Sequence, residues 1–280
     1  MDKIQLLFES YNCASEEGYN KAFEGKTPNE IQRMREEEIN IYIQKSFEQW
    51  ADSPLLCFGG LTPRQIIGNI SILNEAIEYF KIGSIICEKD LPEILLSKMK
   101  SFGEEAENEL IRFASDTKLI NDDEKVYISV IAIRTIGQWK LEKAAPTLIQ
   151  TMDYCSVVNE IVIEEAADAL ISIGSGIVNL LIDRLETHKE INYIDEYLLT
   201  TLVKICKVNK SDRVLNCLKG TFNKMEDKLL GAMCLGDYGD WRAIPALRGF
   251  LNKHGTGVSK ETYLEIKAAI KRLGGDISDI

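Results

Sequence analysis

One short pattern returns along this chain: a helix rich in small apolar residues, a Gly, a few polar residues and a second apolar helix, which often opens with Pro. It reads IAIRTIG at 131–137 followed by AAPTLI at 144–149, then AADALISIG at 166–174 followed by IVNLLI at 177–182. A third copy reads LGDYGDWRAIPAL at 235–247. One helix pair alone would leave an apolar surface in water, and only stacking of successive pairs buries it. The repeat therefore predicts an α-solenoid, in which each pair packs against its neighbours.

The glycines that follow the first helices indicate the period. The intervals between them are 34, 37, 65 and 35 residues, for Gly103, Gly137, Gly174, Gly239 and Gly274. We interpret each as a left-handed C-cap that lets the chain reverse. The long interval holds one degenerate pair, with helices predicted at 194–208 and 212–224. The pattern predicts a repeat array over residues 89–280, closed by a helix at 260–273, after an irregular helical region over 1–88.

Two helix starts can be recognised in the N-terminal region. TPNE at 27–30 and TPRQ at 62–65 each place Thr before Pro, with a Glu or Gln three residues after the Thr, which is the capping-box pattern. The first start leads into a charged amphipathic pattern that predicts one long helix through about Trp50. The residues at 50–63, WADSPLLCFGGLTP, predict a helix–turn–helix with Trp50 buried.

Charge is distributed unevenly over a chain whose formal net charge is −11. Residues 203–272 hold 14 Lys and Arg against 7 Asp and Glu, whereas residues 1–202 hold 19 against 35. The difference suggests a basic C-terminal surface for an acidic partner. The alternative is a set of solvated helix faces that differ in sign.

Several protein classes are disfavoured by composition. No apolar run approaches the roughly 20 residues that cross a bilayer, and the first residues show no basic and apolar signal-peptide pattern. Seven Cys lie scattered without a CxxC pair, which fits a reducing compartment better than a disulfide framework. We expect a cytoplasmic protein without a membrane segment.

Motifs that carry chemistry are few. His188 and His254 are far apart in sequence, and neither has the paired ligand spacing of a zinc site. Cys206 and Cys217 are predicted to pack inside the degenerate pair. GTGVSK at 255–260 lacks the spacing of a phosphate-binding loop, and its Ser is predicted to cap the last helix. We therefore expect no metal, no cofactor, no catalytic residue and no enzymatic activity.

Paired carboxylates are frequent but uninformative about acid–base chemistry. We expect three pairs to lie at helix starts, where they complement the helix dipole; these are Glu104-Glu105, Asp122-Asp123 and Glu164-Glu165. Asn121 with Glu124 is predicted to form a further capping box.

The helix pairs resemble HEAT repeats, specifically the short bacterial type that also occurs in phycobilisome lyases. GDWRAIPAL at 239–247 looks like that family's inter-helix motif, with Trp241 where Pro is usual. In HEAT arrays the turn Asp and the following basic residue often link adjacent repeats, and Asp240 and Arg242 match those positions. Gln138 and Lys140 match only in part. The resemblance covers residues 89–280 and implies a right-handed, all-α solenoid that mostly provides a binding surface.

A second, shorter resemblance lies in the N-terminal region. Residues 50–63 are similar to the W…P…L-G-G-x-T-P motif of bacterial Xre/MbcA/ParS-type toxin-binding domains, with CFGG at 57–60 in place of the Leu-Gly-Gly portion. We interpret the segment as structural, with a toxin-binding surface as the alternative. The motif favours a bacterial origin.

The HEAT resemblance implies a non-enzymatic scaffold or adaptor that binds a protein on its concave side, lined by second helices. The core-facing residues of these helices would be Leu148, Met152, Leu181, Leu185, Leu247 and Leu251. The predicted contact residues are Asn108, Arg112, Gln150, Asp183, Lys219, Trp241, Arg242 and Arg248.

Two other functions remain open. A DNA-binding or DNA-repair protein of the glycosylase type would use the basic C-terminal half, but a sequence pI of about 4.9 disfavours duplex binding. A tetrapyrrole-handling role, as in the phycobilisome lyases, finds no supporting Cys/His arrangement. The partner and the oligomeric state cannot be predicted from the sequence.

Overall fold

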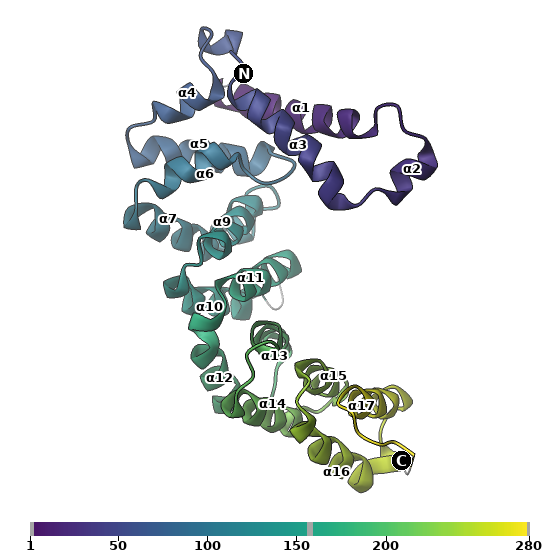
Figure 1. Ribbon diagram of the computed structural model, residues 1–280. Coiled ribbons are helices and arrows are strands. Elements are labelled where there is room, and N and C mark those ends of the chain that lie inside the picture. Colours follow the sequence, from purple (N-terminus) through teal and green to yellow (C-terminus); the bar gives the residue numbers. More distant parts are fainter. Residues whose placement is uncertain (1–2, 156–158, 279–280) are drawn as a thin grey trace. The chain divides into compact units, whose positions relative to one another are not determined.

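The structure is a computed structural model that describes residues 3–155 and 159–278 (Figure 1). Its regular elements in those ranges are helices, and the one β feature among them is an isolated bridge between Leu55 and Leu61. The predicted all-α class is therefore confirmed for the described residues. The chain divides into two compact units, one through Thr135 and one from Ile136 onward, and the division falls inside helix α9. The boundary predicted at residue 88 lies within the first unit and stays a prediction.

The first unit begins with three helices, a short 3-10 turn and a further series of helices. They are α1 (Lys3–Phe23), α2 (Pro28–Arg33), α3 (Glu36–Ala51), η1 (Leu56–Phe58), α4 (Pro63–Gly68), α5 (Leu73–Ile86), α6 (Glu93–Lys100), α7 (Glu104–Ala114), α8 (Thr117–Ile120) and α9 (Val126–Trp139). Helices α1 and α3 lie side by side as a hairpin with α2 at its tip (Figure 1).

Aromatic side chains hold the base of the α1–α3 hairpin together. Tyr11 stacks on Phe47 with ring centroids 4.3 Å apart and meets Trp50 edge-on at 4.9 Å. Trp50 is buried, and its indole Nε1 donates to the Ser10 hydroxyl at 2.9 Å. The predicted burial of Trp50 is confirmed, and this hydrogen bond satisfies its only polar atom.

The predicted single helix from residue 28 to about Trp50 is wrong, because α2 ends at Arg33 and α3 begins at Glu36. Met34 adopts an extended conformation, and the backbone amide of Arg35 donates to the Glu38 carboxylate at 3.3 Å. A second local cap thus competes with helix continuation. Charge periodicity hid this break, because the charged residues on both sides keep a helical spacing.

Three of the four predicted helix starts are confirmed. The backbone amide of Thr27 donates to Glu30 at 2.7 Å, and that of Thr62 donates to Gln65 at 3.0 Å. Ser259 accepts from the backbone amide of Thr262 at 3.1 Å and so begins the last helix. The fourth start, at Asn121, is wrong: the Asp122 carboxylate accepts the Glu124 and Lys125 amides, and α9 begins at Val126.

The second unit continues from α9 as a series of alternating helices. They are η2 (Glu142–Ala144), α10 (Ala145–Cys155), α11 (Glu160–Ile173), η3 (Ser175–Ile177), α12 (Val178–Thr187), α13 (Tyr193–Cys206), α14 (Asp212–Lys224), α15 (Leu229–Tyr238), η4 (Trp241–Ala243), α16 (Ile244–His254), η5 (Gly255–Gly257) and α17 (Lys260–Arg272). The helices of the degenerate pair and the closing helix begin and end within two residues of their predicted bounds.

These helices pack in two rows. The first helices of the pairs contact one another in succession, α11 with α13, α13 with α15, and α15 with α17. Each is also covered by the preceding second helix, as α12 covers α13 and α14 covers α15 (Figure 1). All six leucine and methionine side chains predicted to face the core from the second helices are buried.

The five glycines predicted to be left-handed C-caps differ in their conformation and role. Gly239 is the left-handed C-cap of α15, as predicted. Gly103, Gly174 and Gly274 also have positive φ, but ψ is −137° at Gly103, which is the N-cap of α7, and −140° at Gly174, so these two are not left-handed C-caps. Helix α9 runs through Gly137 and ends at Trp139. A Cβ on Gly137 would lie 2.8 Å from the Cα of Ala169 on α11. The residue is therefore Gly because two helix backbones approach closely there.

Candidate binding surface

An arginine bridge joins two second helices. Arg213 on α14 donates to the side chains of Asn179 at 2.8 Å and Asp183 at 2.6 Å, both on α12. Asp183, predicted to contact a partner, is thus used inside the unit. The bridge connects neighbouring helix pairs and cancels one charge of each sign.

A second bridge includes the predicted inter-repeat pair. Arg242 donates to the Asp240 carboxylate of its own turn at 2.7 Å and to Asp212, at the start of α14, at 2.6 Å. The hydrogen bond from Arg242 holds the pKa of the buried Asp240 carboxyl below its ordinary value, and Asp240 in turn raises the pKa of Arg242. Trp241, beside this bridge, is 69% exposed. Arg242 therefore links adjacent helix pairs as its position predicts.

A partly buried ionic cluster, with Asp195 at its centre, lies where α12 meets α13. The Asp195 side chain is fully buried and accepts from Arg184 at 3.0 Å and from the Asn192 amide at 3.1 Å, and it lies 2.8 Å from Nδ1 of His188. Arg184 also makes a two-point contact with Asp153 on α10, at 2.7 and 3.0 Å. These contacts join α10, α12 and α13. Because Asp195 is held by a cation and by the helix start that it caps, we assign the cluster a structural role.

Two lysines of the basic region cap helix C-termini. Lys224 donates to the carbonyls of Leu185, Glu186 and His188 at 3.0, 2.8 and 2.9 Å, at the end of α12. Lys228 donates to the carbonyls of Phe222 and Asn223 near the end of α14. Burial lowers the pKa of Lys228. Cations at helix C-termini offset the negative end of the helix dipole. Part of the basic excess in residues 203–272 is thus used inside the unit.

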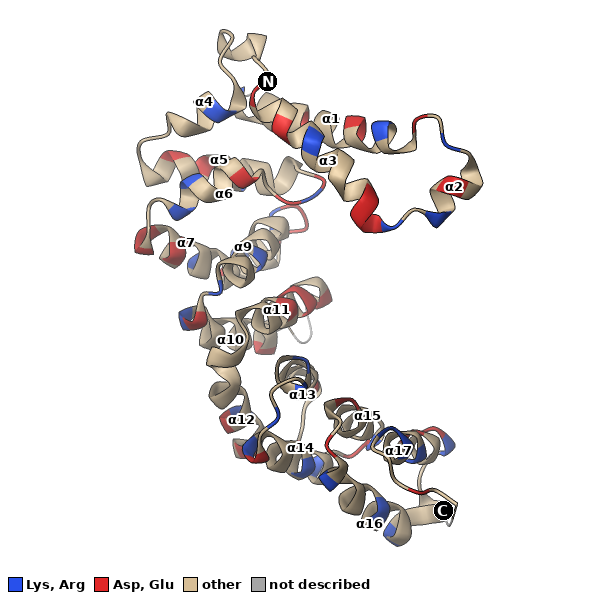
Figure 2. Ribbon diagram, in the orientation of Figure 1, with Lys and Arg blue, Asp and Glu red and all other residues tan. Residues whose placement is uncertain are grey.

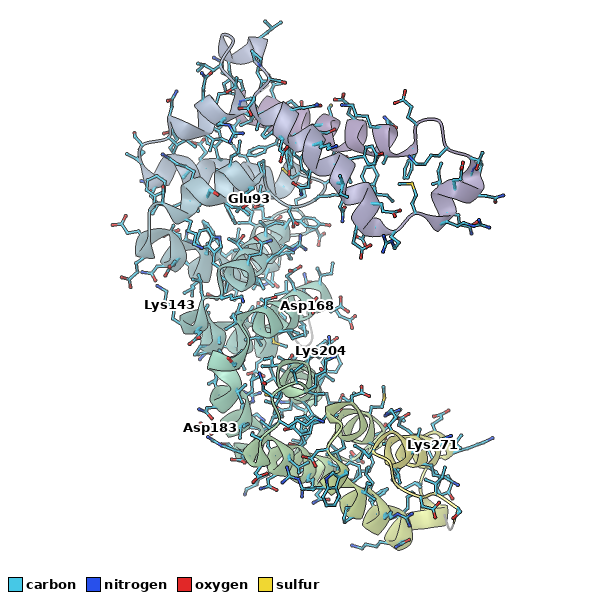
Figure 3. The ribbon with its side chains drawn as sticks, viewed as in Figure 1. Glu93, Lys143, Asp168, Asp183, Lys204 and Lys271 are labelled. Atoms are coloured by element: carbon cyan, nitrogen blue, oxygen red, sulfur yellow. The ribbon has the colours of Figure 1, made fainter. Side chains whose placement is uncertain are left out.

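Helix α11 presents a different surface. It carries four carboxylates and no basic residue. Glu160, Glu164 and Asp168 are exposed and recur every four residues, so they lie on consecutive turns of one face. Ile161, on the same face, is 54% exposed. Figure 2 shows α11 in red without blue, and Figure 3 labels Asp168 there.

Two tyrosines of α13 continue this surface. The Tyr193 hydroxyl donates to Glu160 at 3.0 Å and lies 3.3 Å from the hydroxyl of Tyr197. The rings of the two tyrosines meet edge-on. These hydrogen bonds, the one with Tyr197 foremost, raise the pKa of Tyr193. Tyr193 is nevertheless 45% exposed. We name the surface formed by Glu160, Ile161, Glu164, Asp168, Tyr193 and Tyr197 the α11–α13 face.

The residues predicted to contact a partner are distributed over both units, on α7 in the first and on α10, α12, α14, η4 and α16 in the second. Arg112 on α7 pairs with Glu109 at 2.6 Å, and Asn108, also on α7, is exposed but not without an interaction partner. Gln150 on α10 is exposed, and Lys219 on α14 is half-buried. Arg248 on α16 donates to the carbonyl of Asp276. The structure thus places several of these side chains in internal contacts.

The α11–α13 face was not among the predicted sites. Glu164-Glu165 was expected at a helix start, but α11 begins at Glu160, so the pair lies in the second turn. The usable signal was the lack of any Lys or Arg in 160–173 together with acids four residues apart.

The described part of the structure contains several buried thiols, while Cys13 and Cys57 are exposed. No group of three or more His, Cys, Asp or Glu side chains there could hold a metal ion. Burial raises the pKa of the Cys87 and Cys234 thiols to about 12 and of the Cys155 and Cys217 thiols to about 11. These thiols therefore stay protonated and unreactive near neutral pH.

Among the described helices, none combines the length and the apolar character needed to span a membrane. Comparison with known proteins found no matching family model, no matching curated protein and no matching solved structure.

Proposed function

We propose that this protein is a non-enzymatic scaffold that binds another protein along an extended helical face, and that its repeat region is a right-handed α-solenoid of HEAT-like helix pairs. The observation that carries the proposal is the succession of first helices α11, α13, α15 and α17, each contacting the next. Such a row offers a continuous surface of regularly spaced side chains, which suits recognition of an extended partner. A bacterial, cytoplasmic protein remains our expectation from sequence.

The row of first helices is the better candidate for the binding face. On α12 and on the turn η4 before α16, Asp183 and Arg242 are engaged in bridges to Arg213 and Asp212. On α11, by contrast, Glu164 and Asp168 make no ion pair or hydrogen bond with any described residue. A partner would gain more from these exposed charges than from charges that are already paired.

The DNA-binding alternative loses support from the same geometry. Arg242 is held by two aspartates, and Arg248 is engaged with the carbonyl of Asp276. Phosphate binding would have to compete with these contacts, and the acidic α11 would repel a duplex that approached it.

The test is reconstitution of a complex from purified components. The full chain, tagged and purified from its native host after nuclease treatment, identifies candidate partners, and each is then expressed alone and mixed with the full chain. A stoichiometric complex that forms without nucleic acid supports the proposal. Duplex DNA binding that weakens steeply with salt, or turnover of a small substrate, contradicts it.

A further inference from the structure

We propose that the α11–α13 face is the docking site for a basic amphipathic helix of a partner protein. This inference rests on the proposed function. The face combines three exposed carboxylates, on Glu160, Glu164 and Asp168, with exposed apolar surface on Ile161 and Tyr193. The partner supplies Lys or Arg side chains to the acids and an apolar side chain to Ile161.

The charge pattern of α11 is the first argument. Like charges four residues apart destabilise a helix. Glu160 with Glu164 and Glu164 with Asp168 form two such pairs, and no basic residue in 160–173 offsets them. A cationic partner offsets this repulsion when it binds. Binding therefore gains both the attraction between unlike charges and the relief of the repulsion within α11.

Spacing indicates a helix as the occupant. The three acids span eight residues, which corresponds to about 12 Å along α11 at a rise of about 1.5 Å per residue. A helix with Lys or Arg at every fourth position repeats this spacing when it lies alongside α11. An apolar residue beside the basic row then meets Ile161, as in helix recognition by an amphipathic groove.

The tyrosines of the α11–α13 face are ordered before a partner binds. Tyr193 is tied to Glu160 and Tyr197 by hydrogen bonds, so its ring is already ordered before a partner arrives. A pre-ordered aromatic side chain costs little conformational entropy on binding. Its exposed ring can also attract a Lys or Arg head group.

Nucleic acid does not fit this face, because its phosphates would meet carboxylates. An anionic membrane is disfavoured for the same reason. A second copy of this chain is a competing occupant, since residues 203–272 carry an excess of basic residues. The test below distinguishes this case.

The probe is a fluorescein-labelled synthetic helix of Lys and Leu, with a Glu and Leu peptide of the same pattern as its counterpart. Binding to the full chain is followed by fluorescence anisotropy. We expect the Lys peptide to bind and the Glu peptide not to bind. The double variant Glu164→Lys with Asp168→Lys should weaken binding of the Lys peptide by at least about tenfold.

A matched control separates this face from the general acidity of the chain. Glu48→Lys with Glu78→Lys makes the same change in net charge at two exposed helix positions of the first unit. This control should change the affinity by less than about threefold, an effect within about 0.7 kcal/mol. Equal weakening by both double variants, or equal binding of both peptides, would overturn the proposal.

Two further outcomes are decisive. If the unmodified chain self-associates and the Glu164→Lys with Asp168→Lys variant does not, a second copy occupies the face and the proposal fails. The reconstituted complex with the native partner separates this inference from the proposed function. If the Glu164→Lys with Asp168→Lys variant binds that partner normally, the docking site is wrong while the scaffold function stands.

Discussion

The two rows of helices in the second unit use close contacts of small residues and charged bridges to different extents. Among the first helices, Gly137 lies against Ala169, and a Cβ on Gly236 would come within 3.1 Å of the Ala269 Cβ, while one ion pair joins Arg272 on α17 to Asp237 on α15 at 3.7 Å. Among the second helices, the side chain of Arg213 reaches across from α14 to α12. Gly220, on α14, has no neighbouring atom within 4 Å of an added Cβ.

This difference determines which charges remain available at the surface. At α11 the close contact between Gly137 and Ala169 needs no charged group, and Glu164 and Asp168 on the outer face make no ion pair with any described residue. Bridging by Arg213 and Arg242 uses the charges of both partners, so the second helices expose fewer free charges than their sequence suggests. The net charge of a region in the sequence is therefore a poor guide to which charges its surface leaves available for a partner.

The largest expected effect comes from the cluster that joins the two rows. Asp195→Ala should lower the free energy of unfolding by about 3 kcal/mol, because it removes the buried partner of Arg184 and leaves that charge partly uncompensated. Urea unfolding of the full chain, followed by circular dichroism, measures the change. Asp183→Asn, which removes an exposed charge from the Arg213 bridge, is the control and should shift the midpoint far less. Equal losses in the two variants would remove the distinction between the buried cluster and the exposed bridge.

Two glycine substitutions test the contrast between the rows directly. Gly137→Ala should destabilise the protein by about 1–2 kcal/mol, because the new Cβ meets backbone of α11 at 2.8 Å. Gly220→Ala, on a second helix with open space around it, should stabilise by about 0.5–1 kcal/mol through helix propensity. Thermal unfolding of the two variants should thus shift in opposite directions. A shift of the same sign in both would show that the first helices are no more closely packed than the second.

The Asp240 bridge should make a smaller, pH-dependent contribution. Asp240→Asn keeps a helix-capping side chain but loses the charged hydrogen bond to Arg242, at a cost of about 1 kcal/mol near pH 7. The pKa of Asp240 is lowered in the folded protein. Its stabilisation is therefore complete above the ordinary value of 3.8 and is lost as the pH falls through the lower folded value.

The measurement for this bridge is the difference in unfolding midpoint between the unmodified chain and Asp240→Asn as a function of pH. The difference should be constant from pH 7 down to about 5 and shrink below about 4. A difference that grows as the pH falls would contradict the assigned role of the carboxylate.

Features that depend on a few neighbouring residues could be predicted from sequence. The starts at Thr62 and Ser259, the burial of Trp50 and the bounds of α14 all follow from local spacing and capping chemistry. The helix break near Met34 is a local feature that was missed, because Arg35 is an unusual residue to begin a helix.

Features that depend on which helix comes alongside could not be predicted. Gly137 looks like the C-cap glycines in sequence, and only the approach of Ala169 reveals its role. Arg213 reads as a free surface cation until Asp183, thirty residues earlier, is found beside it. The α11–α13 face is not predictable for the opposite reason. Its acids look ordinary in the sequence, and only the packed helices show that no described Lys or Arg pairs with them.

The smallest expected effect has the opposite sign from most substitutions. Glu164→Lys replaces two repulsive pairs, with Glu160 and Asp168, by two attractive ones, which should stabilise the protein by about 0.5–1 kcal/mol. The shift should decrease in high salt, because exposed charges are screened beyond about 8 Å at physiological ionic strength. Glu78→Lys, an exposed change on α5, controls for the overall reduction in negative charge. If reversing the charge of Glu164 stabilises the protein, the native Glu164 lowers the free energy of unfolding. Such a loss of stability is expected where binding, rather than stability, determines the side chain. If Glu164→Lys instead destabilised the fold, the acids of α11 would be structural, and the contrast between its free face and the paired second helices would disappear.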